Sequence, residues 1–256
     1  MKKIKRKPKS RLQKLPTYII GYTGSGCPPP GFLAAWFNQE YGGPLSIQLS
    51  PSGDIVNFDA VHATWKAAVT GILSVDMRQA WKEQLGWDHE TAAAVYPLSS
   101  QEAGGRISDC DVVLHVARIA RGLSLLTEGT TYDLVMEQFL NPSDWQDHRL
   151  ERFQLHDHVR VEQRERMEEG TMWFLTQGLA KFGIEELETF QPRGLPEQAT
   201  IEALLEIAEV FIQRGKGLNV GESEQYNGIN RVVKVLRHRT DRSLGKPVIL
   251  REVVWE

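Results

Sequence analysis

The chain of 256 residues has only two cysteines, Cys27 and Cys110, and no long apolar segment. Two thiols cannot build a disulfide scaffold or, alone, a thiolate zinc site, so we expect a protein of a reducing compartment, the cytoplasm. No run approaches the roughly 18 uninterrupted apolar residues that a membrane-spanning helix needs. The basic start, residues 1–14, could open a secretory signal peptide. The apolar stretch after it is short and cut by glycine and proline, without the roughly 7–15-residue apolar region of such signals, so we expect none.

This first segment is strongly basic, whereas the rest of the chain is acidic. The net charge is −3, but residues 1–14 hold eight of the 30 lysines and arginines, which leaves 22 basic residues against 33 acidic ones. Clustered cations suit phosphate contacts, so a nucleic-acid association is one interpretation. No aromatic residue is interleaved for base stacking, which favours a disordered, solubilising tail instead. The cations are Lys2, Lys3, Lys5, Arg6, Lys7, Lys9, Arg11 and Lys14.

Two parts of the chain carry clear periodic patterns. In residues 159–177 two stretches of alternating apolar and polar residues flank the turn sequence RMEEG, which predicts an antiparallel hairpin. In residues 195–215 apolar residues recur at helical spacing, and Gly215 follows them as a cap, which predicts a helix.

Weaker patterns complete the predicted fold, an α+β protein with a mixed, largely antiparallel sheet and packed helices. Residues 59–98 are predicted to be largely helical. The segment 231–239 is predicted to be an edge strand protected by charge, or alternatively a basic stripe for an acidic partner, with Val235 and Arg239 on the same side. Further strands are predicted at 17–22, 44–50, 130–140 and 246–256, a helix at 28–43, and a helix, or a strand followed by a helix, at 110–129. Two closely associated lobes are predicted, at 15–100 and 107–256, joined by the loop at 99–106.

A glycine cluster ends the second strand of the predicted hairpin, in the sequence TMWFLTQGLAKFGIEELET at residues 171–189. Gly178 and Gly183 can adopt positive φ or allow close backbone approach. Leu179 and Phe182 are spaced to fill the core above this bend. The cluster therefore predicts a structural corner, with Lys181 and Glu186 at its rim. In the alternative, Thr176, Lys181 and Glu186 surround a small anionic ligand.

The same stretch resembles a bacterial domain family of unknown function over about residues 125–225. The shared pattern is carried by Trp173, Thr176, Gly178, Leu179, Lys181, Phe182, Gly183, Glu186 and Leu187. The resemblance implies a common fold and no established activity.

A pair of histidines is the main candidate for a metal site. His156 and His158 would point to one face if they began a strand, a spacing used by metal ligands. His148 is a candidate third ligand, with Asp144 and Asp147 also nearby in sequence. The competing interpretation is a solvated strand entry.

The sequence GYTGSGCPPPG at residues 21–31 lies between a predicted strand and a predicted helix, where phosphate-binding loops occur. It lacks the Lys-Ser/Thr pair of such loops, and its three prolines remove N–H donors. A helix start could lower the pKa of Cys27, but no His and Asn/Asp partner pattern accompanies it.

No pattern in the sequence reaches a nucleophile with a base, or three metal ligands. We therefore expect a non-enzymatic protein-binding or regulatory module with a protein partner and no cofactor. The alternatives are a metal-dependent hydrolase that uses His156 and His158, and a nucleic-acid-associated protein held by its basic tail.

Overall fold

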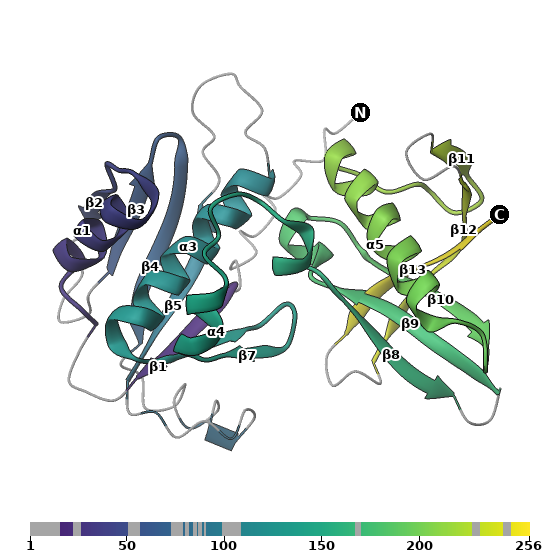
Figure 1. The fold of residues 1–256 in the computed structure, drawn as a ribbon, viewed down its shortest axis with the longest axis horizontal. Coiled ribbons are helices and arrows are strands. Elements are labelled where there is room, and N and C mark those ends of the chain that lie inside the picture. The colour runs from purple at the N-terminus through teal and green to yellow at the C-terminus, as the bar shows by residue number, and fades with distance from the viewer. Residues whose placement is uncertain are drawn as a thin grey trace, which may run out of the picture.

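The computed structural model describes most of the chain from Pro16 to Glu256 (Figure 1). The predicted basic tail and the predicted loop at 99–106 lie outside the described residues. The described ranges are 16–22, 27–50, 57–72, 91–98, 109–166, 170–226, 231–242 and 247–256, together with residues 79, 82, 83, 86 and 89.

Seven of the described strands form the first sheet, which is antiparallel throughout, in the order β2-β3-β4-β5-β1-β6-β7. Strand β1 (Tyr18–Tyr22) lies between β5 and β6, and all five of its residues are buried. The other strands are β2 (Ser46–Leu49), β3 (Asn57–His62), β4 (Trp65–Ile72), β5 (Thr91–Leu98), β6 (Thr130–Asp133) and β7 (Gln138–Leu140).

Two helices, α1 (Pro30–Tyr41) and α3 (Asp109–Thr127), lie against one face of this sheet (Figure 1). Leu33 and Phe37 of α1 and Ile119 of α3 are fully buried in one cluster with side chains of the sheet. The segment 110–129 is thus helical almost throughout, without a preceding strand in its described part.

The prediction of a largely helical segment at residues 59–98 is wrong where the structure describes it. Strands β3, β4 and β5 pair consecutively there. Ala60, Ala67 and Ala93 are fully buried in the cluster that the helices share with the sheet. Alanine favours helices in isolation, but its small side chain also leaves room for a helix on a sheet, so tertiary packing outweighs the local preference.

Six further described strands form the second sheet, in the order β11-β12-β13-β10-β9-β8. Strands β10 and β13 are parallel, and the other neighbours are antiparallel. The predicted hairpin is confirmed as β8 and β9. The strands are β8 (Arg160–Arg166), β9 (Thr171–Gln177), β10 (Glu186–Pro192), β11 (Ser223–Tyr226), β12 (Arg231–Asp241) and β13 (Val248–Trp255).

The predicted helix at 195–215 is confirmed as α5 (Glu197–Arg214), which covers one face of the second sheet (Figure 1). Leu204 and Phe211 of α5 pack with Phe174 of β9 in a second core cluster. Gly215 ends the helix in the left-handed conformation, which glycine adopts without a steric penalty.

Strand β12 contains an irregularity between Val235 and Arg237. Val235 is buried in the cluster that includes α5, whereas Arg239 lies over the ring of Trp173 on the opposite face. The prediction that Val235 and Arg239 share a side is therefore wrong, because the irregularity reverses the alternation of side chains. Residues 231–234 also pair with β11, so this part of β12 is not an edge.

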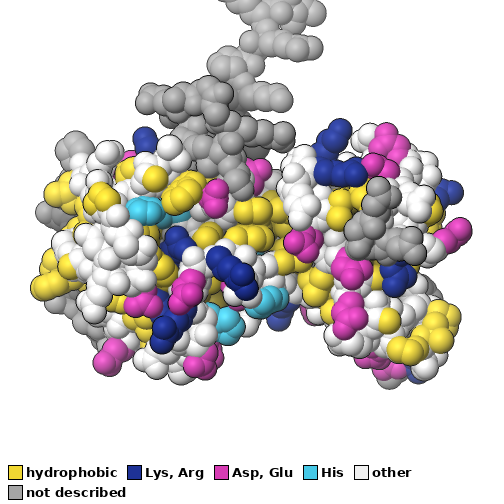
Figure 2. Space-filling view, turned by 45° about the horizontal axis from the view of Figure 1, so that its top comes forward, with side chains coloured by type: hydrophobic (Ala, Val, Ile, Leu, Met, Phe, Trp, Pro, Cys, Tyr) yellow, Lys and Arg dark blue, Asp and Glu magenta, His cyan; other side chains and the backbone are white. Residues whose placement is uncertain are grey.

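The chain passes from the first sheet to the second through α4 (Pro142–Asp147) and the short 3₁₀ helix η1 (Leu155–Asp157). Strands β6 and β7 follow residue 107 but belong to the first sheet, so the division into sheets differs from the predicted division at 99–106. Hydrophobic side chains gather where the two sheet-centred lobes meet (Figure 2). The α+β fold class with largely antiparallel sheets is confirmed. Among the described helices, none has the length and apolar character to cross a membrane.

Candidate functional site

The glycine cluster forms a tight corner between β9 and β10. Gly178 has a φ of 127°, and a Cβ placed on it would lie 2.1 Å from the carbonyl oxygen of His158. The 3₁₀ helix η2 (Leu179–Phe182) follows, and Gly183 then takes the left-handed conformation. Only glycine fits position 178, because both the conformation and the contact exclude a side chain.

The carboxylate of Glu186 lies inside this corner and is bonded within the chain. It accepts hydrogen bonds from the N–H groups of Gly178, Leu179 and Ala180 at 3.0, 3.2 and 3.1 Å. It also accepts one from the hydroxyl of Thr176 at 2.8 Å. Burial raises the pKa of Glu186, while these hydrogen bonds act to lower it. Thr176 and Glu186 are thus brought together as partners of each other.

Lys181 points away from these two residues, towards the first sheet. Its Nζ lies 2.5 Å from Oδ2 of Asp133, and both side chains are almost fully buried. The same ammonium donates to the carbonyl of His158 at 3.2 Å and lies 5.3 Å from the centre of the Tyr18 ring. The arrangement gives no support to an anion site formed by Thr176, Lys181 and Glu186, and Lys181 is buried instead of lying at a rim.

The two neighbouring histidines have different surroundings. The segment before β8 is the 3₁₀ helix η1 and not a strand, so His156 and His158 do not share a face. The side chain of His156 is 66% exposed, with its Nε2 3.5 Å from Oδ1 of Asp157. His158 is fully buried and stacks on Phe153 at 5.0 Å.

The chemistry of these histidines also differs from that of a metal centre. Burial, with Lys181 nearby, lowers the pKa of His158 to about 3. The exposed His148 bonds through Nδ1 to the carbonyl of Asp144 at 2.8 Å. Nowhere in the described part of the chain do three or more His, Cys, Asp or Glu residues come together in a way that could hold a metal ion.

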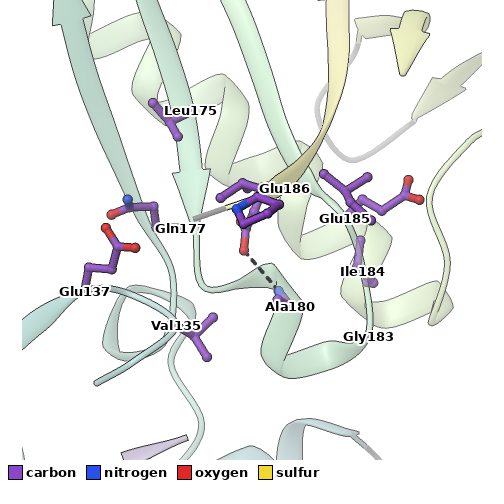
Figure 3. Close-up of a pocket in the computed structure, with 12 residues that line it drawn as sticks. Val135, Glu137, Leu175, Gln177, Ala180, Gly183, Ile184, Glu185 and Glu186 are labelled. Carbon is purple, nitrogen blue, oxygen red and sulfur yellow. Dashed lines mark hydrogen bonds between the residues drawn. The ribbon is translucent and has the colours of Figure 1, made fainter. Parts of the chain in front are cut away.

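A cavity of about 340 Å³, the inter-sheet cavity, lies beside the glycine corner (Figure 3). It is bounded by the turn between β6 and β7, by the ends of β9 and β10, and by the start of β13. Its lining residues are Val135, Glu137, Leu175, Gln177, Ala180, Gly183, Ile184, Glu185, Glu186, Pro247, Val248 and Ile249.

Apart from Glu186, the charged and amide side chains of the inter-sheet cavity lie at its two ends. Figure 3 shows Glu137 beside Gln177 at one end and Glu185 at the other. The side-chain oxygen of Gln177 accepts a hydrogen bond from Arg160 at 2.8 Å, and Glu185 is paired with Arg251. The twelve lining residues include three glutamates and no lysine, arginine, histidine, serine or cysteine. The cavity can therefore hold an apolar group, but its described lining offers no nucleophile with a base.

A second, polar cavity of about 590 Å³ lies near the end of α5. Most of its charged residues have bonding partners within the lining: Arg214 bonds to Glu224 at 2.5 Å, Glu222 to Asn219, and Arg251 to Glu185 and the carbonyl of Leu218. This arrangement is that of a solvated network of ion pairs.

Cys27 lies outside both cavities. Burial raises the pKa of its thiol to about 11, so the structure does not favour a reactive thiolate at this position.

Several residues of the candidate site were not singled out from the sequence, above all Asp133, Val135 and Glu137. The prediction of one strand at 130–140 is wrong, because these residues form β6, a turn and β7. The signal was Asp133 itself, because aspartate often accepts hydrogen bonds from N–H groups two or three residues later. Its Oδ1 accepts from Val135 and Met136, both at 2.9 Å.

Comparison with known proteins finds no matching family model, no similar curated protein and no similar solved structure. The resemblance suggested by the pattern from Trp173 to Leu187 receives no support from these comparisons and stays a prediction.

Proposed function

We propose that this protein is a non-enzymatic protein-binding module, and that its partner binds at the inter-sheet cavity. A volume of about 340 Å³ is in the range of sites that receive a small ligand or an anchoring side chain. The observation that carries the proposal is an apolar cavity whose buried carboxylate, Glu186, is already bonded inside the chain. Such a site offers apolar surface for binding, and the internal hydrogen bonds of its buried carboxylate do not favour a role for that group as a catalytic acid or base.

A protein partner suits the cavity because its apolar lining continues to the surface. Ile249 lines the cavity, yet 46% of this residue is exposed. Exposed apolar area beside a hollow is typical of interfaces in which one side chain is anchored and its surroundings exclude water. The same proposal sets the protein in the cytoplasm, which its low cysteine content favours.

The other two functions have less support. A hydrolase built on His156 and His158 would need their imidazoles to converge, and His158 is buried against Phe153. The nucleic-acid interpretation depends on residues 1–14, which lie outside the described residues, and it stays a prediction.

The proposal is tested by affinity capture from the native host with matched variants. Ile249→Asp places a charge in the cavity wall and should abolish retention of the partner. Leu195→Asp, at a position that is 50% exposed and outside the cavity lining, should retain it like the unmodified chain. Equal retention by both variants, or no stoichiometric partner at all, would contradict the proposal. Circular dichroism should first show that both variants are folded.

A further inference from the structure

A third cavity, of about 480 Å³, lies in the lobe of the first sheet where α1, α3 and α4 come together, and we call it the Arg121 cavity. Its volume is in the range of sites that bind small ligands. None of its lining residues lines the inter-sheet cavity, so it is a separate site that does not depend on the function proposed above. The lining residues are Glu40 from the last turn of α1, Arg121 and Leu125 from α3, Gln146 from α4, and Arg149, which follows α4.

The buried charge of this cavity is the guanidinium of Arg121, whose side chain is only 4% exposed. Its Nε donates a hydrogen bond to the carbonyl of Trp145 at 2.8 Å, and its Nη1 donates to the hydroxyl of Tyr41 at 2.9 Å. Nη1 also lies 3.0 Å from Oε1 of Glu40. The rings of Trp36 and Tyr41 lie 5.3 and 5.8 Å from the guanidinium carbon. These contacts from α1 and α4 hold the planar group in one orientation.

Part of this guanidinium is left without a partner. Arginine has five N–H donors in one plane, one at Nε and two at each Nη. The bonds to Trp145, Tyr41 and Glu40 use the donors at Nε and Nη1, and Nη2 has no partner within the described ranges. Nη2 is also not among the fully buried polar atoms that lack a hydrogen bond. Solvent therefore reaches it, and the cavity gives an outside acceptor access to its two N–H groups.

The second cation of the cavity, Arg149, is exposed, and among the described residues it has no ion-pair partner. Gln146, which is also exposed, adds an amide donor to the lining. Glu40 is the single acidic residue of the lining and is bonded to Arg121. The lining thus carries a net charge of +1, from two arginines and one glutamate, in a chain whose net charge is −3.

We propose that the Arg121 cavity binds a phosphate monoester of a small organic molecule. Nη2 of Arg121 and the guanidinium of Arg149 donate to different oxygens of one phosphate group, which has three acceptor oxygens and close to two negative charges at pH 7. Two guanidinium groups suit such a dianion better than a carboxylate, which has one charge and two oxygens. A phosphate group alone is much smaller than 480 Å³, so the cavity leaves room for the organic part against Leu125.

Isothermal titration calorimetry of the full chain with phenyl phosphate at pH 7.5 tests the proposal. We expect saturable binding with one site per chain. Arg149→Gln should weaken this binding at least about tenfold, because charge-assisted hydrogen bonds are among the strong ones. Arg242→Gln is the matched control. It removes another exposed arginine, outside the cavity lining, and should leave the affinity unchanged.

Glu40→Gln distinguishes a phosphate site from an ion pair that serves only the structure. The amide keeps an oxygen for Nη1 of Arg121 but removes the negative charge of the lining. Phenyl phosphate should therefore bind about fivefold more tightly, the Coulombic effect of one unit charge at short range in water. Glu40 is exposed, as are Arg149 and Arg242, so these variants should fold, and circular dichroism checks that they do.

Two further ligands define the chemistry of the site. Inorganic phosphate should bind more weakly than phenyl phosphate, because it leaves the apolar side chain of Leu125 uncovered. Acetate should bind at least about tenfold more weakly than inorganic phosphate, since it offers less charge and fewer oxygens to the two arginines.

Four results would overturn the proposal. The first is no saturable binding of phenyl phosphate, and the second is equal binding by Arg149→Gln and Arg242→Gln. The third is an affinity in Glu40→Gln that is unchanged or weaker, because Glu40 would then not lie beside the bound anion. The fourth is a different order of ligands: acetate as tight as inorganic phosphate would indicate a carboxylate site, and inorganic phosphate as tight as its ester would indicate free phosphate.

Discussion

At the residue scale, the carboxylate of Glu186 takes the place that an external anion would occupy at a group of backbone N–H donors. Three consecutive N–H groups at the start of η2 and the hydroxyl of Thr176 point at it. Backbone donors at the start of a helical turn commonly bind anions. Here the chain supplies its own anion, which stabilises the corner and leaves Thr176 and Glu186 with internal partners.

The buried imidazole of His158 should make the folded state sensitive to acid. Burial lowers its pKa to about 3, against an ordinary value of about 6.5. Between these values the unfolded chain binds a proton that the folded protein does not, so stability is complete above about pH 6.5 and falls as the pH is lowered. Between pH 7 and about pH 4.5, His158 should lower the unfolding free energy of the unmodified protein by on the order of 2–3 kcal/mol. In His158→Leu the fall in unfolding free energy over this pH range should be smaller by that amount.

The measurement is urea denaturation at both pH values. His148→Leu is the control, because His148 is exposed. The unfolding free energy of this variant should fall with pH as much as that of the unmodified protein. His115, whose pKa is lowered to about 4 by burial, remains in both variants, so some decline should persist. An unchanged pH dependence in His158→Leu would contradict this assignment.

At the scale of elements, the corner between β9 and β10 should depend on one of its two glycines far more than on the other. Gly178→Ala combines a positive φ with a Cβ 2.1 Å from a backbone oxygen, and should cost at least about 3 kcal/mol of unfolding free energy. Gly183 has a positive φ but no atom within 4 Å of an added Cβ, so Gly183→Ala should cost only about 1 kcal/mol. Chemical denaturation of both variants checks this, and equal costs would contradict the role given to His158 as a backbone neighbour.

The local sequence pattern predicted correctly those elements whose apolar spacing is typical of only one kind of secondary structure. The hairpin of β8 and β9 and the helix α5 follow from alternation and helical spacing, which are set by burial of one face. Strands β3 to β5 were missed because their alanines have a helical preference that packing in the sheet overrides. The reversal of β12 after Val235 was missed because a bulge leaves no clear periodic signal.

The candidate site, like the fold, was predictable from the sequence only in its local part. The corner itself, with Leu179 and Phe182 buried above it, followed from the glycine spacing and is seen in the structure. The partner of Lys181 did not follow, since Asp133 is 48 residues away in sequence. The cavity was out of reach for the same reason, because its walls come from three distant segments that only the fold brings together.

At the scale of the whole molecule, the two sheets are joined by an ion pair and by shared apolar packing. Lys181, at the corner of the second sheet, reaches Asp133 at the end of β6 in the first. Phe153 packs against the core clusters of both sheets. The inter-sheet cavity lies beside this junction, so the geometry of the cavity depends on how firmly the junction is held.

Removing the ammonium of Lys181 should therefore destabilise the protein as a whole. In Lys181→Met the carboxylate of Asp133 stays buried without its cation, which should lower the unfolding free energy by about 3–5 kcal/mol. Adding Asp133→Asn removes this unpaired charge while keeping an oxygen for the N–H groups of Val135 and Met136. The double variant should regain part of the loss, and a double-mutant cycle in urea measures the coupling.

The exposed pair of Arg214 and Glu224 is the control: Arg214→Met should change stability little, because solvent screens such pairs. If Lys181→Met were as mild as Arg214→Met, or if the cycle showed no coupling, the ion pair would not be what holds the two sheets at the cavity.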